Sequence, residues 1–207
     1  QEPSSRINLH LLHFLEALLD RQPIPGLTEV PDRTVIPVRT AVPDGNQSRE
    51  IVRERRKKLG ELAVKHERVF NIAYLIDHHL LRVAGEKLRA SAAPGIDHMT
   101  ARKYRRDLPL NIIKLHKEVR HKTYQPSPNR RVSIEKDDGS KRHLGLPTTR
   151  DKHLQRAVMI LLEAVYEPNF YKHSYGFRPR RSARKAVKVL RTWLADQKNA
   201  WVLEIDL

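Results

Sequence analysis

The sequence predicts an α+β fold that is rich in helix and holds one β-hairpin and one late strand. Three observations lead to this prediction. Apolar residues recur at helical spacing over most of the chain, two short alternating stretches flank an Asp-Gly pair at residues 138–139, and the last seven residues alternate again. Of the 207 residues 39% are apolar, which suits a packed core, although a charged fraction of 31% is high for a globular domain.

The charge balance favours a polyanionic partner. Lys and Arg total 40 against 24 Asp and Glu, which gives a formal net charge of +16. Phosphate binding by such a chain releases condensed counterions, so nucleic acid is the expected partner. A membrane is not expected, because no stretch approaches the roughly 18 apolar residues of a membrane span. The absence of cysteine excludes disulfides, thiolate catalysis and cysteine-based zinc sites within this chain.

The first quarter of the chain is expected to form an arm. Residues 6–20 carry leucine and isoleucine at helical spacing, and prolines then recur with few large apolar residues. We therefore expect residues 1–48 to form a short helix followed by a proline-rich arm or linker.

Residues 49–100 are expected to form a helical N-terminal extension. The helical pattern covers residues 49–88, with a split near Gly60, and Pro94 with Gly95 indicates a turn after it. The basic cluster at residues 53–58 is either a solvated helix face or an RNA contact, and the sequence leaves both open.

The middle of the chain predicts a broken helix and then a hairpin. A helical stretch runs from about residue 100 to residue 119, with a break at Pro109. Alternating residues then indicate strands over 130–136 and 141–146. Asp-Gly between alternating stretches is a strong hairpin signal.

The last third predicts helix, loop, helix and strand. An apolar stripe covers residues 154–165, and Pro168 ends that helix. Ser182 is a suitable N-cap for a second helix, whose stripe runs over residues 183–194. Residues 201–207 alternate as a strand does.

Two cations at the hairpin are the first candidate site. Lys136 ends the first strand and Arg142 lies near the start of the second, so both can project from one end of the ribbon. A lysine point charge beside an arginine fork suits a triphosphate. The alternative is that a hairpin tip is simply polar.

A carboxylate near the chain's last residue is the second candidate. Asp206 lies on the predicted strand at residues 201–207, whose alternate residues are apolar, and Glu204 shares its face. Two-metal phosphoryl transfer needs several carboxylates, so one Asp leaves the site incomplete. A solvent-facing acid on an edge strand is the alternative.

An aromatic and basic segment at residues 173–184 is the third candidate. Tyr175 and Phe177 flank Gly176, and four arginines follow within seven residues. Aromatic faces can stack on bases, glycine permits close backbone approach and arginine binds phosphate. The alternative is a basic loop whose aromatic residues pack into the core.

Five short blocks occur in order along the chain. They are Gly95-Ile96-Asp97-His98-Met99-Thr100, then Tyr124-Gln125-Pro126, then residues 130–139, then Arg142-His143-Leu144-Gly145-Leu146-Pro147, and finally Ser174-Tyr175-Gly176-Phe177-Arg178-Pro179. This series, within residues 69–207, resembles the group II intron-encoded reverse transcriptase/maturase family. Many relatives have proline where this chain has Glu135 and His143.

The resemblance implies a right-hand polymerase fold that is incomplete here, with fingers at residues 101–195 and the start of the palm at 196–207. It implies that Asp206 is a catalytic residue and binds Mg²⁺ in the complete protein. Nucleotide-binding residues are expected to be Lys136, Arg142, Tyr175, Gly176, Phe177 and Arg178, and RNA-binding residues Arg130, Arg131, Arg180 and Arg181.

The implied activity belongs to a longer parent. That parent is expected to be an RNA-directed DNA polymerase that also assists splicing, with intron RNA as template, a DNA primer and dNTP as partners. Its expected location is the bacterial cytoplasm, in association with nucleic acid. We expect this chain alone to lack polymerase activity, and a catalytically inactive RNA-binding remnant or split-gene product is the alternative.

Overall fold

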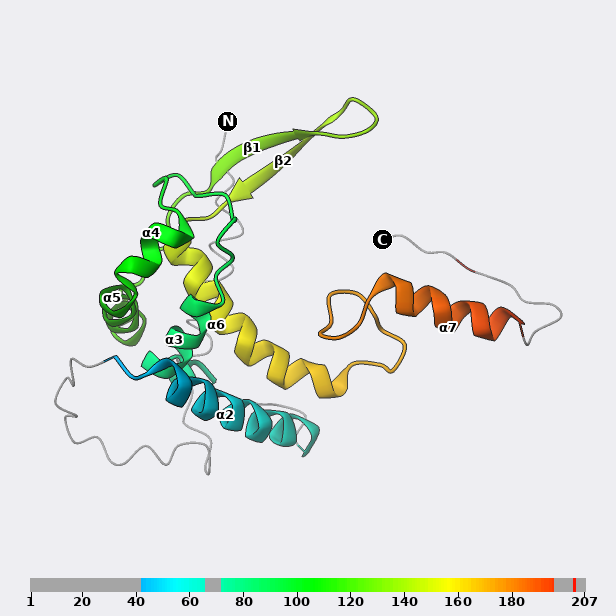
Figure 1. Ribbon diagram of the computed structural model, residues 1–207, viewed down its shortest axis with the longest axis horizontal. Coiled ribbons are helices and arrows are strands. Elements are labelled where there is room, and N and C mark those ends of the chain that lie inside the picture. The colour runs from blue at the N-terminus through cyan, green and yellow to red at the C-terminus, as the bar shows by residue number, and fades with distance from the viewer. Residues whose placement is uncertain (1–41, 66–71, 196–202, 204–207) are drawn as a thin grey trace.

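The computed structural model describes residues 42–65, 72–195 and 203 (Figure 1). The elements in these ranges are α2 (Gly45–Lys65), η1 (Ile72–Leu75), α3 (His78–Glu86), α4 (Ala101–Arg106), α5 (Leu108–Arg120), β1 (Arg130–Glu135), β2 (Lys141–Leu146), α6 (Thr149–Tyr166), η2 (Glu167–Asn169) and α7 (Ala183–Ala195). A helix-rich α+β architecture with one antiparallel hairpin is thus confirmed. The expected helix at residues 6–20 lies outside the described residues, as does the strand at 201–207 apart from Leu203.

Four helices share one hydrophobic core. Helix α2 packs on α3 and α6, and α3 packs in turn on α5 and α6. Large side chains that are fully buried come from all of these helices and from the turn before α3: Leu59, Ile76, Leu80, Leu81, Ile112, Leu115 and Leu154. Helices on both sides of residue 100, where a domain boundary was expected, contribute to this core. The division of the chain into domains at that residue stays a prediction.

Polar side chains fix where the helices begin. Asp77 caps α3 by accepting a hydrogen bond from the Leu80 N–H at 3.0 Å, and Thr100 and Thr148 cap α4 and α6 in the same way. The break expected at Pro109 is confirmed, because α4 ends at Arg106 and α5 begins at Leu108. These caps satisfy backbone donors that helix geometry leaves without partners.

Helix α2 runs without a break through Gly60, so the expected split there was wrong. Glycine costs a helix about 1 kcal/mol relative to alanine, yet tertiary contact outweighs that preference here. A Cβ at this position would lie 3.4 Å from the Ala164 carbonyl oxygen and 3.5 Å from Pro168 Cγ. Gly60 therefore lets α2 approach the C-terminal end of α6 closely.

Helix α7 begins after Ser182, as predicted, and the Ser182 Oγ accepts a hydrogen bond from the Lys185 N–H at 3.3 Å. It has no buried residue, and Val187, Leu190 and Leu194 on its apolar stripe are exposed. Within the described ranges no helix is both long and apolar enough to cross a bilayer.

Two histidines, one buried in the core and one partly exposed on α5, have a pKa below the ordinary value. His153 Nε2 donates to the Leu81 carbonyl oxygen at 2.6 Å, and its Nδ1 faces the Tyr104 hydroxyl at 3.1 Å. His116 Nε2 accepts from Arg120 Nε at 3.2 Å. Burial lowers the pKa of His153, and burial together with the nearby His78 and Arg120 lowers the pKa of His116 to about 4.

We predict that the chain loses stability as the pH falls from about 7 towards about 4. In the unfolded chain these histidines bind a proton near their ordinary pKa of about 6.5. In the folded chain they bind a proton only at lower pH, because their pKa is lowered. Acid therefore favours the unfolded chain, which binds more protons. His116→Gln should reduce the loss by about 1–2 kcal/mol, after allowance for screening of a partly exposed ring.

Urea unfolding at pH 7 and pH 4.5 measures this effect. His121→Gln, which alters an exposed histidine on the same helix end, is the matched control. Equal pH dependence of the wild-type and His116→Gln chains would contradict the prediction.

Candidate functional site

The hairpin turn brings the two predicted cations onto one face. Ile134 pairs with Arg142 across the ladder, and Lys136 lies two residues beyond Ile134, so side-chain alternation places all three on the same side. Gly139 has a φ of +76° and its N–H donates to the Lys136 carbonyl oxygen at 2.9 Å. Glycine is needed here because the left-handed conformation closes the turn.

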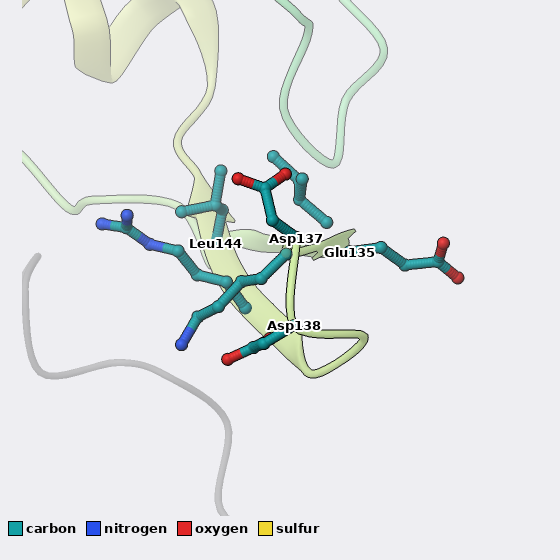
Figure 2. A pocket seen from close by; sticks show the side chains of 7 residues that line it. Glu135, Asp137, Asp138 and Leu144 are labelled. Atoms are coloured by element: carbon teal, nitrogen blue, oxygen red, sulfur yellow. The ribbon is translucent and has the colours of Figure 1, made fainter.

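An open pocket of about 740 Å³ lies along this face (Figure 2). Its lining residues are Ile134, Glu135, Lys136, Asp137, Asp138, Arg142 and Leu144. The Glu135 carboxylate points away from Leu144 and Asp138. The Asp138 carboxylate accepts hydrogen bonds from the Ser140 hydroxyl and N–H, which lower the pKa of Asp138.

The opposite face of the hairpin carries a separate set of polar groups. Ser133 lies opposite His143, with Oγ and Nδ1 2.9 Å apart, and Glu135 lies opposite Lys141. The predicted RNA-binding residue Arg131 shares this face by alternation. Lys141 is therefore adjacent to Arg142 in sequence but on the other side of the ribbon.

A buried carboxylate holds the root of the hairpin, which is the end where its two strands join the helical part of the chain. Asp151 has no exposed surface, and Oδ1 accepts from the Tyr124 hydroxyl at 2.6 Å. Its Oδ2 accepts from the Thr148 hydroxyl at 2.7 Å and from the Ser127 N–H at 3.1 Å. Burial and the bond to Asp151 raise the pKa of Tyr124, so its hydroxyl stays a donor. Three donors from both flanks of the hairpin thus converge on α6.

The loop at residues 89–99 is packed against the same root. A Cβ on Gly95 would lie 2.6 to 2.8 Å from backbone atoms of Pro147 and Thr148, so no other residue fits without a shift. Arg130 Nε donates to the Pro94 carbonyl oxygen at 3.2 Å. The predicted RNA-binding residue Arg130 therefore also has a structural contact.

A second cluster of hydrogen bonds lies at the C-terminal end of α6. Arg178 Nε donates to Glu167 Oε2 at 3.2 Å, and Nη2 donates to Glu167 Oε1 at 3.0 Å and to the Glu167 carbonyl oxygen at 3.5 Å. Its Nη1 donates to the carbonyl oxygens of Tyr171 and Ser174 at 2.8 and 2.9 Å. All five N–H groups of this guanidinium are used inside the chain. The Arg178 side chain is accordingly only 7% exposed.

Comparison with known proteins gives three informative similarities. A 97-residue segment is 41% identical to the group II intron-encoded protein LtrA of Lactococcus lactis subsp. cremoris, covering 46% of this chain and 16% of that protein. A 122-residue segment is 36% identical to Protein YkfC of Escherichia coli (strain K12), covering 58% and 32%. A 121-residue segment is 32% identical to an uncharacterized 91 kDa protein in the cob intron of Schizosaccharomyces pombe, covering 58% and 15%. No protein-family model matches the chain.

Over about half of its length the chain is homologous to group II intron-encoded proteins. The resemblance carried by the five ordered blocks is thereby confirmed. The matched segments span about a third or less of these relatives, so the similarity concerns one part of each relative.

In this chain the predicted nucleotide-binding residues fall into two places. Lys136 and Arg142 lie beyond the N-terminal end of α6, whereas Tyr175, Gly176, Phe177 and Arg178 follow its C-terminal end (Figure 1). Helix α6 has 18 residues and is therefore about 27 Å long. Among the described residues, no hydrogen bond, ion pair or ring contact joins the two groups. Their nucleotide-binding roles stay predictions.

The segment at residues 175–185 presents one fully exposed aromatic ring and several cations. Phe177 is fully exposed, at 110% of its reference surface, and has a φ of 55°. A left-handed conformation costs a non-glycine residue about 1 kcal/mol or more. The Arg181 guanidinium covers the Tyr175 ring at 5.1 Å from its centroid. A Cβ on Gly176 would meet nothing within 4 Å, so internal packing does not require this glycine.

The predicted metal ligand cannot be placed. Asp206 lies outside the described residues. In the part of the chain that is described, no group of three or more His, Asp or Glu could hold a metal ion. The Mg²⁺ site expected in the complete protein stays a prediction.

Sequence reasoning missed three residues that organise these places. Nothing local in the sequence marks Asp151 or Glu167 as a carboxylate that accepts hydrogen bonds from other segments. Gly95 was assigned to a turn, but its role is a close backbone approach to Thr148. The Thr148-Thr149-Arg150-Asp151 spacing, which is typical of a helix N-terminal cap, is the one signal that could have drawn attention to Asp151.

We predict that Tyr124→Phe destabilises the chain by about 1.5–3 kcal/mol, because it removes a hydrogen bond to a buried charge. Asp151→Ala should cost more, since it leaves three donors without an acceptor. Urea unfolding measures both. Asp138→Ala, which removes an exposed hydrogen-bonded carboxylate, is the matched control and should change stability by about 0.5 kcal/mol or less. A Tyr124→Phe effect as small as that of the control would contradict the role assigned to Asp151.

Proposed function

We propose that this chain forms the N-terminal and fingers part of an RNA-directed DNA polymerase of the group II intron type. The observation that carries the proposal is the pairing of Lys136 and Arg142 on one face of an exposed hairpin, in a chain that is homologous over about half of its length to group II intron-encoded proteins. A lysine and an arginine held on one rigid ribbon can bind the triphosphate of an incoming nucleotide.

The partners follow from the same proposal. Intron RNA would be the template, DNA the primer and dNTP the substrate. The formal charge of +16 supports a polyanionic partner. The exposed cations on the opposite hairpin face, among them Arg131 and Lys141, could bind backbone phosphates. Splicing assistance is part of the proposal because the relative LtrA is encoded by a group II intron.

The reaction itself would need groups beyond those described. In the complete protein we assign Asp206 as one ligand of Mg²⁺, which would neutralise charge on the phosphates during transfer. What the described residues supply is binding: the hairpin face orients the triphosphate, and the buried root holds that face at a fixed place relative to α6.

The nucleotide-binding role of the hairpin has a direct test. Lys136→Ala and Arg142→Ala should each weaken dATP binding by this chain about tenfold, the loss expected for one charge-assisted phosphate contact. Displacement of a fluorescent nucleotide measures the affinity. Lys141→Ala is the matched control, because it removes a neighbouring cation from the opposite face. Equal losses in all three variants would mean that net charge, and not this face, binds the nucleotide.

Primer extension tests the polymerase proposal itself. In a protein that continues beyond Leu207 with the remaining palm sequence, dNTP incorporation on an RNA template is expected. Asp206→Ala should abolish incorporation while leaving RNA binding intact. Extension at the wild-type rate by the Asp206→Ala protein would overturn the metal-ligand assignment.

A second function is favoured by one observation. The formal net charge of +16 is what is expected of a module that binds RNA without catalysis. That alternative requires RNA binding that weakens steeply with salt, and no incorporation by any continuation of the chain. Incorporation in the primer-extension experiment decides against it.

A further inference from the structure

The segment after α6 contains one arginine that cannot serve as a phosphate contact in its present state. The Arg178 guanidinium donates all five of its N–H groups to Glu167, Tyr171 and Ser174, and its side chain is 7% exposed. It also lies over the Phe170 ring, 5.0 Å from the centroid. These contacts link the first residue of the segment at residues 167–178 to its last residue. The Arg178 side chain alone therefore closes this loop.

The residue immediately before Arg178 is presented to solvent. Phe177 has no covered surface and adopts a left-handed φ of 55°, which the chain would not choose for a phenylalanine without a compensating constraint. The neighbouring Arg178 supplies that constraint, because the hydrogen bonds of its guanidinium fix the backbone on one side of Phe177. Tyr175 differs, since the Arg181 guanidinium already covers its ring. Phe177 is thus the most exposed aromatic residue of this segment, whereas the Tyr171 ring contacts the His173 ring at 5.3 Å between centroids.

The surroundings of Phe177 indicate which ligand fits. Arg180 and Arg184 are exposed, and Lys185 Nζ donates to the Arg180 carbonyl oxygen at 2.8 Å, which holds a further cation beside the loop. An exposed ring beside fixed cations matches a nucleobase that is flanked by phosphates, and stacking on a ring requires the base to be unpaired.

We propose that Glu167 and Arg178 form a clamp that positions Phe177 to stack on an unpaired base of single-stranded RNA. Arg178 is a positioning residue and acts through Phe177. This inference rests on the proposed function, because it takes RNA as the partner, and it assigns to the clamp a task separate from nucleotide binding at the hairpin.

The test compares two single strands of roughly 12 nucleotides, a length within the range of single-strand sites. One is an ordinary RNA and the other has the same backbone without bases, and binding of each to the 207-residue chain is measured by fluorescence anisotropy. Phe177→Leu should weaken binding of the ordinary strand about tenfold or more, the loss expected for one base stack, and leave the base-free strand unchanged. Phe177→Trp, which keeps an aromatic face, should retain wild-type binding.

The clamp residues should show the same signature. Arg178→Lys and Glu167→Gln should each reduce affinity for the ordinary strand only, and neither should reduce it further when Phe177→Leu is already present. The salt dependence should keep its slope, because no phosphate contact is lost. Tyr171→Leu, which alters another exposed aromatic residue of the loop, is the matched control and should have no effect.

Each other outcome has a distinct meaning. Wild-type binding that is equal for the two strands would overturn the stacking role while leaving RNA binding in place, and would indicate that protein covers Phe177. Loss of affinity for both strands in Arg178→Lys would show a phosphate contact or a general structural role. Absence of binding to either strand at low salt would overturn the proposed RNA partner together with this inference.

Discussion

The buried Asp151 carboxylate is the interaction on which the arrangement of this chain depends. A charge with no exposed surface is costly unless it is fully hydrogen-bonded, and here three donors come from residues on both sides of the hairpin. The same residue lies in the first turn of α6, where the N-terminal dipole favours a negative charge. One side chain therefore joins the start of the central helix to both flanks of the hairpin.

Because the root is fixed in this way, the hairpin can be exposed over most of its length and still hold a defined direction. A two-stranded ribbon is only marginally stable alone, and β1 and β2 bury little of their own surface. Gly95 adds a second restraint, since its backbone lies against Pro147 and Thr148 where the hairpin ends. The helical core thus holds the hairpin in place, and the exposed cations at its tip can bind a ligand.

The fold was predictable where local pattern and tertiary packing agree. The hairpin, the break at Pro109 and the cap at Ser182 all depend on residues close in sequence, and the structure confirms them. The split at Gly60 was wrong because the close approach of α2 to Ala164 is a contact between segments about a hundred residues apart. For the same reason the roles of Asp151 and Glu167 could not be foreseen: their partners are set by the packing of loops, which no periodicity encodes. Lys136 and Arg142 could be paired from sequence because a hairpin register is local.

The structure also divides the large positive charge into two classes. Arg49, Arg55 and Arg56 in and beside the basic cluster of α2 pair with Glu86, Asp77 and Glu163, and Arg178 pairs with Glu167, so these cations hold elements together. The cations at the hairpin and in the segment after Phe177 are exposed instead. The formal charge of +16 already subtracts the acids in these ion pairs, so it comes from other cations, and those exposed beyond the two ends of α6 are among them. The two exposed groups lie beyond opposite ends of α6, a helix about 27 Å long, so each offers its own surface to a ligand. They can bind a nucleotide at one end and a stretch of RNA at the other.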